Sequence, residues 1–239
     1  MKLPFITLVL LCCSCSTHYQ INSNSVDHVS WNEGQGKVVQ HVNGADPKTF
    51  QELLPFYGKD QNGVFWGSSI IEGADSATFV AIDNYYGVDA YHGIVKGNVI
   101  LESDGASFEY LGNNWSRDFS SYFYNGERLD LCDYDTFKII KSLLSDRARD
   151  NKCLYDKSKT VPIKDAESLV VLPANYAKDR FHVYWAASII NGADPLTFVV
   201  KDKRSLSIAK DKNACYSGAQ ILSCIDLNDD GQKFCGCNQ

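Results

Sequence analysis

An aspartate that stands four residues before a phenylalanine or leucine recurs six times along this chain of 239 residues. The six aspartates are Asp46, Asp75, Asp104, Asp133, Asp165 and Asp194. Their apolar partners are Phe50, Phe79, Phe108, Phe137, Leu169 and Phe198, each directly preceded by serine or threonine. Successive aspartates are 29, 29, 29, 32 and 29 residues apart. Such a period is typical of repeat proteins, in which each small unit buries its apolar face against the next. We therefore expect an array of six repeats rather than one large core.

A second aspartate recurs with the same period, 14 residues after the first, or 17 in the fourth and sixth repeats. These aspartates are Asp60, Asp89, Asp118, Asp150, Asp179 and Asp211. A basic residue precedes five of the six, and a Phe, Ile or Tyr follows each by five residues. An aspartate carboxylate can accept hydrogen bonds from backbone N–H groups two or three residues further on. Both sets of aspartates are therefore predicted to be structural residues of tight turns.

Each repeat is predicted to hold two or three short strands around one hairpin. Aromatic and β-branched runs such as 64–66 and 183–185 favour strands, and Lys96-Gly97 and Asn125-Gly126 are typical hairpin turns. The expected fold class is all-β, an array of about six short β-hairpin repeats with a period near 29 residues. The apolar residues from Phe137 to Leu144 have helical spacing, which indicates one short helix around residues 137–144.

The N-terminus has the pattern of an export signal. Lys2 is followed by an apolar stretch over residues 3–13, which is shorter than the about 20 residues needed to span a bilayer. Ser14 before Cys15 resembles the lipobox of bacterial lipoproteins, which implies a signal peptide over residues 1–14 and a lipid on Cys15. Cys13 is the alternative lipidation site, and ordinary secretion is the alternative without a lipid. Residues 15–36 are polar and are expected to form a flexible tether.

The repeats resemble the DKNYY family of bacterial repeat proteins, whose pattern joins Lys-Asp-Lys-Asn-x-x-Tyr-Tyr to Gly-Ala-Asp-Pro-x-Thr-Phe. The first half matches at Lys59-Asp60-Gln61-Asn62-Gly63-Val64-Phe65-Trp66, at Lys178-Asp179 and at Lys210-Asp211-Lys212-Asn213. The second half matches at Gly44-Ala45-Asp46, Gly73-Ala74-Asp75 and Gly192-Ala193-Asp194. The resemblance covers a repeat domain over residues 37–222. The family has no assigned function, so the resemblance implies a repeat fold, often behind a lipoprotein signal, and no catalytic residues.

Six cysteines follow the signal region, and an even number in an exported chain favours disulfides. We expect Cys132 and Cys153 to form one bridge. The other four, Cys215, Cys224, Cys235 and Cys237, would form two more and attach the tail, residues 223–239, to the last repeat. A zinc site is the alternative, but Cys235-Gly236-Cys237 has one residue between its cysteines, fewer than zinc knuckles have.

The tail also contains the start of a calcium-loop pattern. Asp226, Asn228, Asp230 and Gln232 place side-chain oxygens at alternate positions, with Gly231 at the sixth. The glutamate expected at the twelfth position is Cys237 instead, so a polar turn is the favoured interpretation and calcium the alternative. We expect no other cofactor.

The composition and motifs point away from nucleic-acid binding and from catalysis. The chain has 23 Lys and Arg against 29 Asp and Glu, a net charge of −6, so it lacks the basic excess that phosphate neutralisation needs. Recurring aspartates could be imagined as an acid/base pair for glycoside hydrolysis. Because they recur in every repeat, we interpret them as turn residues and expect no enzyme. Trp66, Trp115 and Trp185 are expected in the core, with a sugar- or peptide-binding surface as the alternative.

The sequence therefore predicts an exported, lipid-anchored repeat protein that binds or scaffolds at the bacterial cell envelope. Its expected partners are the membrane, through the lipid, and a protein or glycan of the envelope. Ser16 rather than aspartate follows Cys15, which implies the outer membrane in a Gram-negative host. An envelope enzyme or enzyme inhibitor and a structural spacer are the two alternative functions.

Overall fold

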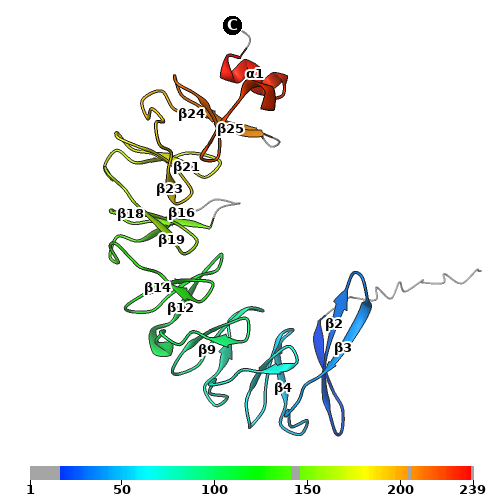
Figure 1. The fold of residues 1–239 in the computed structure, drawn as a ribbon. Helices are drawn as coiled ribbons and strands as arrows, with labels where there is room; N and C mark the ends of the chain where they lie inside the picture. Colours follow the sequence, from blue (N-terminus) through cyan, green and yellow to red (C-terminus); the bar gives the residue numbers. More distant parts are fainter. Residues whose placement is uncertain (1–16, 141–145, 204–205, 238–239) are drawn as a thin grey trace, which may run out of the picture. The chain divides into compact units, whose positions relative to one another are not determined.

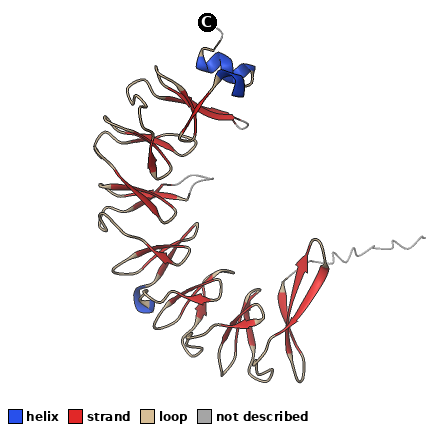
Figure 2. Cartoon of the chain, in the orientation of Figure 1, coloured by secondary structure: helices blue, strands red, loops and turns tan. Residues whose placement is uncertain are grey.

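The computed structural model describes residues 17–140, 146–203 and 206–237. Within these residues the chain forms seven small antiparallel sheets, one with three strands and six with four (Figures 1 and 2). The strands of each sheet follow one another in chain order, so each sheet is a meander. This confirms the expected all-β array of short repeats. The chain divides into two compact units, Met1–Tyr110 and Leu111–Gln239.

The first three repeats each supply one four-stranded sheet. Repeat 1 contains β4 (Gln51–Leu54), β5 (Tyr57–Lys59), β6 (Val64–Trp66) and β7 (Ser69–Ile70). Repeat 2 contains β8 (Val80–Ala81), β9 (Tyr86–Val88), β10 (Gly93–Val95) and β11 (Asn98–Val99). Repeat 3 begins with the 3-10 helix η1 (Gly105–Ser107) and contains β12 (Glu109–Gly112), β13 (Trp115–Arg117), β14 (Tyr122–Tyr124) and β15 (Glu127–Arg128).

The last three repeats have the same plan, and the tail follows them. Repeat 4 contains β16 (Lys138–Ile140), β17 (Arg147–Arg149), β18 (Cys153–Asp156) and β19 (Lys159–Pro162). Repeat 5 contains β20 (Val170–Val171), β21 (Tyr176–Lys178), β22 (Val183–Trp185) and β23 (Ser188–Ile189). Repeat 6 contains β24 (Val199–Lys203), β25 (Leu206–Lys210), β26 (Cys215–Ser217) and β27 (Gln220–Leu222). The tail holds the 3-10 helix η2 (Cys224–Asp226) and the helix α1 (Asp229–Cys235).

The second and third strands of each repeat form a hairpin, and the second recurring aspartate opens its turn. In repeat 1, Lys59 pairs with Val64, and the Asp60 N–H donates to the Gly63 carbonyl at 3.0 Å. The equivalent bonds, each 2.9 or 3.0 Å long, join Asp89 to His92, Asp118 to Ser121, Asp150 to Cys153, Asp179 to His182 and Asp211 to Ala214. The predicted turn between two strands is therefore present in all six repeats.

The third and fourth strands are joined by tight turns that need the left-handed backbone region. In repeat 2, Val95 pairs with Asn98, so the turn consists of Lys96 and Gly97, with φ of 48° and 77°. Asn125 and Gly126 have φ of 50° and 83° in repeat 3. Glycine and asparagine tolerate this region with little strain, which confirms the predicted hairpin turns.

The core is a row of small clusters, each shared by two neighbouring repeats. Tyr57, Val64 and Ile71 of repeat 1 pack with Phe79 and Ile94 of repeat 2. The same arrangement joins repeats 3 and 4, 4 and 5, and 5 and 6. A four-stranded sheet of two- to five-residue strands cannot enclose these aromatic rings by itself, so burial depends on the neighbouring repeat.

Residues 18–41 form a folded sheet, which corrects the expected polar tether over residues 15–36. The sheet consists of β1 (His18–Ile21), β2 (Val26–Asn32) and β3 (Gly36–His41). Tyr19 and Val26 are 5 % and 0 % exposed and pack with Phe50 and Phe65 of repeat 1. Few apolar residues are needed here because repeat 1 supplies the other half of the cluster. A polar composition was therefore a misleading signal.

This N-terminal sheet has the plan of the second, third and fourth strands of a repeat in the described residues. The Val42 N–H donates to the Val26 carbonyl at 2.9 Å, as the Ile71 N–H donates to the Val64 carbonyl at 2.8 Å in repeat 1. Gly44-Ala45-Asp46 then follows β3 as Gly73-Ala74-Asp75 follows β7. The array therefore begins one partial repeat earlier than residue 37.

The described part of the stretch around 137–144 is a strand rather than the expected helix. Lys138, Ile139 and Ile140 pair with Arg149, Ala148 and Arg147, and residues 141–144 lie outside the described residues. The three-residue spacing from Phe137 to Ile140 equals that from Phe50 to Leu53, which leads into β4. The spacing therefore marks the repeat and not a helical turn. Among the described residues, the one α-helix is α1, in the tail.

Candidate functional site

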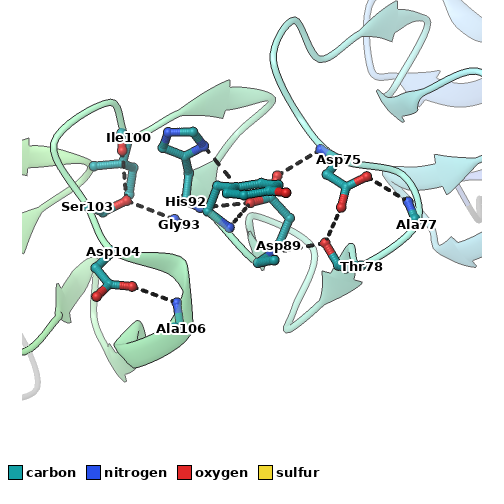
Figure 3. Close-up of polar contacts among 12 residues, drawn as sticks. Asp75, Ala77, Thr78, Asp89, His92, Gly93, Ile100, Ser103, Asp104 and Ala106 are labelled. Atoms are coloured by element: carbon teal, nitrogen blue, oxygen red, sulfur yellow. Dashed lines mark hydrogen bonds and ion pairs between the residues drawn. The ribbon is translucent and has the colours of Figure 1, made fainter.

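The two recurring aspartates of a repeat are joined by a hydrogen bond between the backbone of one and the carboxylate of the other. In repeat 2, the Asp75 N–H donates to Oδ2 of Asp89 at 2.8 Å (Figure 3). The Asp75 carboxylate accepts from the Thr78 hydroxyl at 2.6 Å and from the Ala77 N–H at 3.2 Å. Asp75 therefore shapes the first turn of the repeat, while Asp89 ties that turn to the central hairpin.

The other carboxylate oxygen of the second aspartate is bonded within the hairpin turn. Oδ1 of Asp89 accepts from the Tyr91 and His92 N–H groups at 2.8 and 2.7 Å. The same pair of bonds, from the residues two and three further on, is made by Asp60, Asp118, Asp150, Asp179 and Asp211. This is the predicted aspartate turn, and the hydrogen bonds confirm it in all six repeats.

The bond between the two aspartates recurs in four further repeats. It joins Asp46 to Asp60, Asp133 to Asp150, Asp165 to Asp179 and Asp194 to Asp211, at 2.6 to 3.0 Å. In repeat 3, the Asp104 carboxylate accepts from the Ala106 N–H at 2.8 Å (Figure 3). Five of the second aspartates, those of repeats 1 to 5, are 1 to 5 % exposed. A buried carboxylate needs this number of donors, because an unpaired one would be costly.

The serine or threonine of the first turn adds a third connection. Its hydroxyl oxygen accepts from the N–H that follows the second aspartate, at 2.9 to 3.4 Å, in the pairs Thr49–Gln61, Thr78–Ala90, Thr136–Asn151, Ser168–Arg180 and Thr197–Lys212. The hydroxyl therefore links two loops that are 12 or 15 residues apart in sequence. This explains why the position holds a hydroxyl residue in these five repeats.

The hydrogen bonds also set the electrostatics of the turns. Burial disfavours the charged form of Asp179, but donors from Tyr184 and from backbone N–H groups outweigh it and hold its pKa below the usual range. The same balance lowers the pKa of Asp211. Burial and the bond to Asp211 raise the pKa of Tyr216 to about 12. These carboxylates are thus stabilised as fixed anions, which suits a structural role better than proton transfer.

The repeats share a further position, always occupied by a small residue, that the sequence analysis did not identify. The residue two before the second aspartate is Gly58, Gly87, Ser116, Ala148, Ala177 or Ala209. A Cβ on Gly58 would come within 2.3 Å of the Phe50 ring, and one on Gly87 within 2.5 Å of the Phe79 ring. The aromatic residue of the first turn therefore lies directly over this strand position. The same 29-residue alignment that revealed the aspartates would have revealed it.

In repeats 1 and 5, the lysine before the second aspartate connects one repeat to the next. Lys59 Nζ donates to the Phe79 carbonyl at 3.1 Å, and Lys178 Nζ donates to the Phe198 carbonyl at 2.9 Å. In both cases the lysine reaches the first turn of the following repeat, 20 residues on. The sequence showed the residue but not its partner, because the partner is a backbone carbonyl.

Arg147 in β17 occupies the position that holds Tyr57, Tyr86, Trp115 or Tyr176 in other repeats. Its side chain is 1 % exposed, and Nη1 donates to the Tyr176 carbonyl at 3.3 Å. Nε and Nη2 have no hydrogen-bond partner in the described part of the chain. Burial lowers the pKa of this guanidinium.

Three disulfides pair the six cysteines of residues 132–237, which confirms the expected number of bridges. Cys132–Cys153 lies in repeat 4 and confirms the predicted bridge. Cys215–Cys235 and Cys224–Cys237 attach the tail to repeat 6. The Lys210 Nζ donates to the Phe234 carbonyl at 2.6 Å, so the last lysine of the series reaches α1 instead of a further repeat. The helix therefore takes the place of a seventh complete repeat.

The residues of the calcium-loop pattern have other partners in the structure. Asn228 is the N-cap of α1 and accepts from the Gly231 N–H at 2.9 Å, while the Gln232 amide donates to the Cys224 and Leu227 carbonyls. The Asp226 carboxylate accepts from the Ser223 N–H at 3.3 Å. In the parts of the chain that the structure describes, no three His, Cys, Asp or Glu side chains are grouped as metal ligands.

A cavity of about 290 Å³ lies between the last hairpin turn and the tail. Ile221, Leu222 and Leu227 line its apolar part, and the turn 211–214 lines its polar part. Both tail disulfides contribute to its walls. It is a small, open hollow.

Most of the large aromatic side chains belong to the core, as predicted. Trp115 is fully buried, and Trp66 and Trp185 are half-buried against the clusters of their repeats. The exceptions include Tyr91 and Phe181, which are 65 % and 54 % exposed. Both stand two residues after the second aspartate, at the tip of a hairpin turn.

The small meander sheets and their shared clusters define a β-repeat protein whose recurring acids are turn residues. A sequence model of the DKNYY family matches residues 27–159 and 144–220, so the chain belongs to the DKNYY family. No curated protein and no solved structure matches the chain. In the described residues, no helix is long and apolar enough to cross a membrane. Cys15 and the signal region lie outside the described residues.

Proposed function

We propose that the protein is an exported, lipid-anchored module that binds or scaffolds a protein or glycan at the bacterial cell envelope. Its partners are the membrane, through Cys15, and that envelope component; it has no catalytic activity. The hairpin tips that present exposed aromatic rings on fixed turns, above all those of Tyr91 and Phe181, are the observation that carries the binding function. The three disulfides favour an oxidising compartment and so support export.

The aromatic tips are well suited to binding. Oδ1 of Asp179 accepts from the Phe181 and His182 N–H groups at 2.7 Å each, so the tip is held before any partner arrives. A large ring on a rigid turn loses little conformational freedom on binding. The equivalent tips of repeats 1 and 6 carry Asn62 and Asn213. The rings are therefore not needed to form the turn.

Site-specific photocrosslinking in cells tests the binding function. A photoreactive phenylalanine analogue replaces Tyr91 or Phe181 in one pair of variants, and Asn62 or Asn213 in the matched pair. We expect a discrete crosslinked product from the aromatic tips and none from the asparagine tips. Crosslinking at no tip would favour a spacer.

The anchor is tested separately. We expect Cys15→Ser to move the protein from the membrane fraction to the soluble fraction, and the mass of the wild-type N-terminal peptide to include acyl chains on Cys15. A variant that stays acylated and membrane-bound would assign the lipid to Cys13 instead.

A further inference from the structure

The chain enters the N-terminal sheet very close to the proposed anchor. β1 begins at His18, three residues after Cys15, and His18 pairs with Val29 of β2. Because β1 is antiparallel to β2, its N-terminal end lies toward the end of β2 that carries Trp31. Three residues span at most about 10 Å, so this end of the sheet cannot be far from the anchor. A folded sheet thus replaces the long tether that would have separated the body from a membrane.

Trp31 differs from the other three tryptophans of the chain. Its side chain is 55 % exposed, whereas Trp115 is fully buried and Trp66 and Trp185 are half-buried in the core. Trp31 pairs with the exposed Lys37 across β2 and β3. Val39 is 54 % exposed and lies on the same face of the sheet by register. An apolar ring beside a lysine matches the water–lipid boundary, where tryptophan and lysine side chains are both favoured.

The turn next to Trp31 is held in one conformation. The Asn32 side chain accepts from the Gly34 N–H at 2.9 Å, and the Asn32 carbonyl accepts from the Gln35 N–H at 3.2 Å. Glu33 in this turn offsets the charge of Lys37. Attraction to a surface would therefore come from the tryptophan ring and depend little on the charge of the lipid.

We propose that the Trp31 end of the N-terminal sheet lies in the headgroup region of the bilayer that holds the Cys15 lipid. The proposal rests on the lipid anchor of the proposed function and names a phospholipid surface as the second contact of the same protein. It makes the first sheet a membrane-contacting element, which fixes the start of the array at the bilayer surface instead of letting it swing on a tether.

Fluorescence quenching in vesicles tests this contact. The full-length lipidated protein is reconstituted in phosphatidylcholine vesicles with or without bromine atoms on the acyl chains. We expect brominated lipid to quench part of the tryptophan emission of the wild type and of the Trp185→Phe control. Quenching should be lost in Trp31→Phe, and the wild-type signal should be the same in low and high salt.

The outcomes separate this proposal from the anchor. Suppose that the protein floats with the vesicles and its Cys15 is acylated, but wild type and Trp31→Phe are quenched equally. This result would overturn the membrane contact of Trp31 and would leave the lipid anchor in place. An N-terminal region without acyl chains on either Cys13 or Cys15 would overturn both. Protection of Trp31 from aqueous iodide in the unacylated Cys15→Ser protein, measured in buffer without detergent or lipid, would show that protein already covers the ring, and would also overturn the proposal.

Discussion

Single aspartates hold the turns of this protein because each carboxylate oxygen meets a different loop. Asp179 shows the arrangement most fully: its Oδ1 accepts from Phe181 and His182, and its Oδ2 accepts from Asp165 and the Tyr184 hydroxyl. Removing a buried acceptor leaves its donors without partners, which usually costs more than the bond itself contributed. The repeated acids are therefore expected to matter for stability.

We predict that Asp179→Asn lowers the free energy of unfolding by about 3 kcal/mol, because its amide would point N–H groups at existing donors. Asp130→Asn, at an exposed acid, should change it by less than about 0.5 kcal/mol. Denaturant titration of both variants measures the difference. Equal stability of Asp179→Asn and the wild type would contradict the structural role.

The same variant should change the pH dependence of stability. The pKa of Asp179 is lower in the folded protein, so its contribution is complete above the unfolded value near 3.9 and is lost as the pH falls below it. The wild type should therefore lose stability below about pH 4 more steeply than Asp179→Asn. If the stability of the wild type and that of Asp179→Asn fall in parallel over that pH range, the Asp179 carboxylate is not stabilised as a hydrogen-bonded anion.

At the scale of the element, the tail helix depends on its covalent links. α1 has seven residues, fewer than an isolated helix needs to be stable in water, and two disulfides and Lys210 attach it to repeat 6. Its Asn228 N-cap and Gly236 C-cap, with φ of 76°, define both ends. The caps specify a helix, and the bridges specify where it lies.

Replacing Cys215, Cys224, Cys235 and Cys237 with alanine is predicted to release α1. Amide hydrogen exchange in residues 229–235 should approach the unprotected rate, and stability should fall by about 3 kcal/mol or more. A matched Cys132→Ala, Cys153→Ala variant should raise exchange in repeat 4 and leave α1 protected. Persistent protection of α1 after loss of both tail bridges would show that packing alone holds it.

On the scale of the whole molecule, stability is distributed over contacts between neighbours. Tyr19 of the N-terminal sheet donates to the Phe56 and Gly67 carbonyls at 2.8 and 2.9 Å, as Tyr57 of repeat 1 donates to the Tyr85 carbonyl at 2.9 Å. The N-terminal sheet therefore covers repeat 1 in the way that repeat 1 covers repeat 2. A terminal repeat without such a cover would expose an aromatic cluster.

A chain that starts at residue 43 is predicted to lose protection in repeat 1. Phe50 and Phe65 would lose Tyr19 and Val26, so hydrogen exchange in β5 and β6 should rise and a hydrophobic dye should bind. Exchange in β26 of repeat 6 should stay unchanged because repeats contact only their neighbours. Normal protection of β5 and β6 in the shortened chain would restore the tether interpretation.

The sequence by itself determined the repeats, their strands and their turn residues, because these depend on local chemistry that recurs every 29 or 32 residues. It also indicated the Cys132–Cys153 bridge from proximity along the chain. Only the tertiary structure decided that residues 18–36 fold, that Phe137 leads into a strand, and that Lys59 reaches the next repeat. In each of these cases the partner is supplied by a neighbouring repeat or by backbone carbonyls, which leave no mark on the sequence of the segment itself.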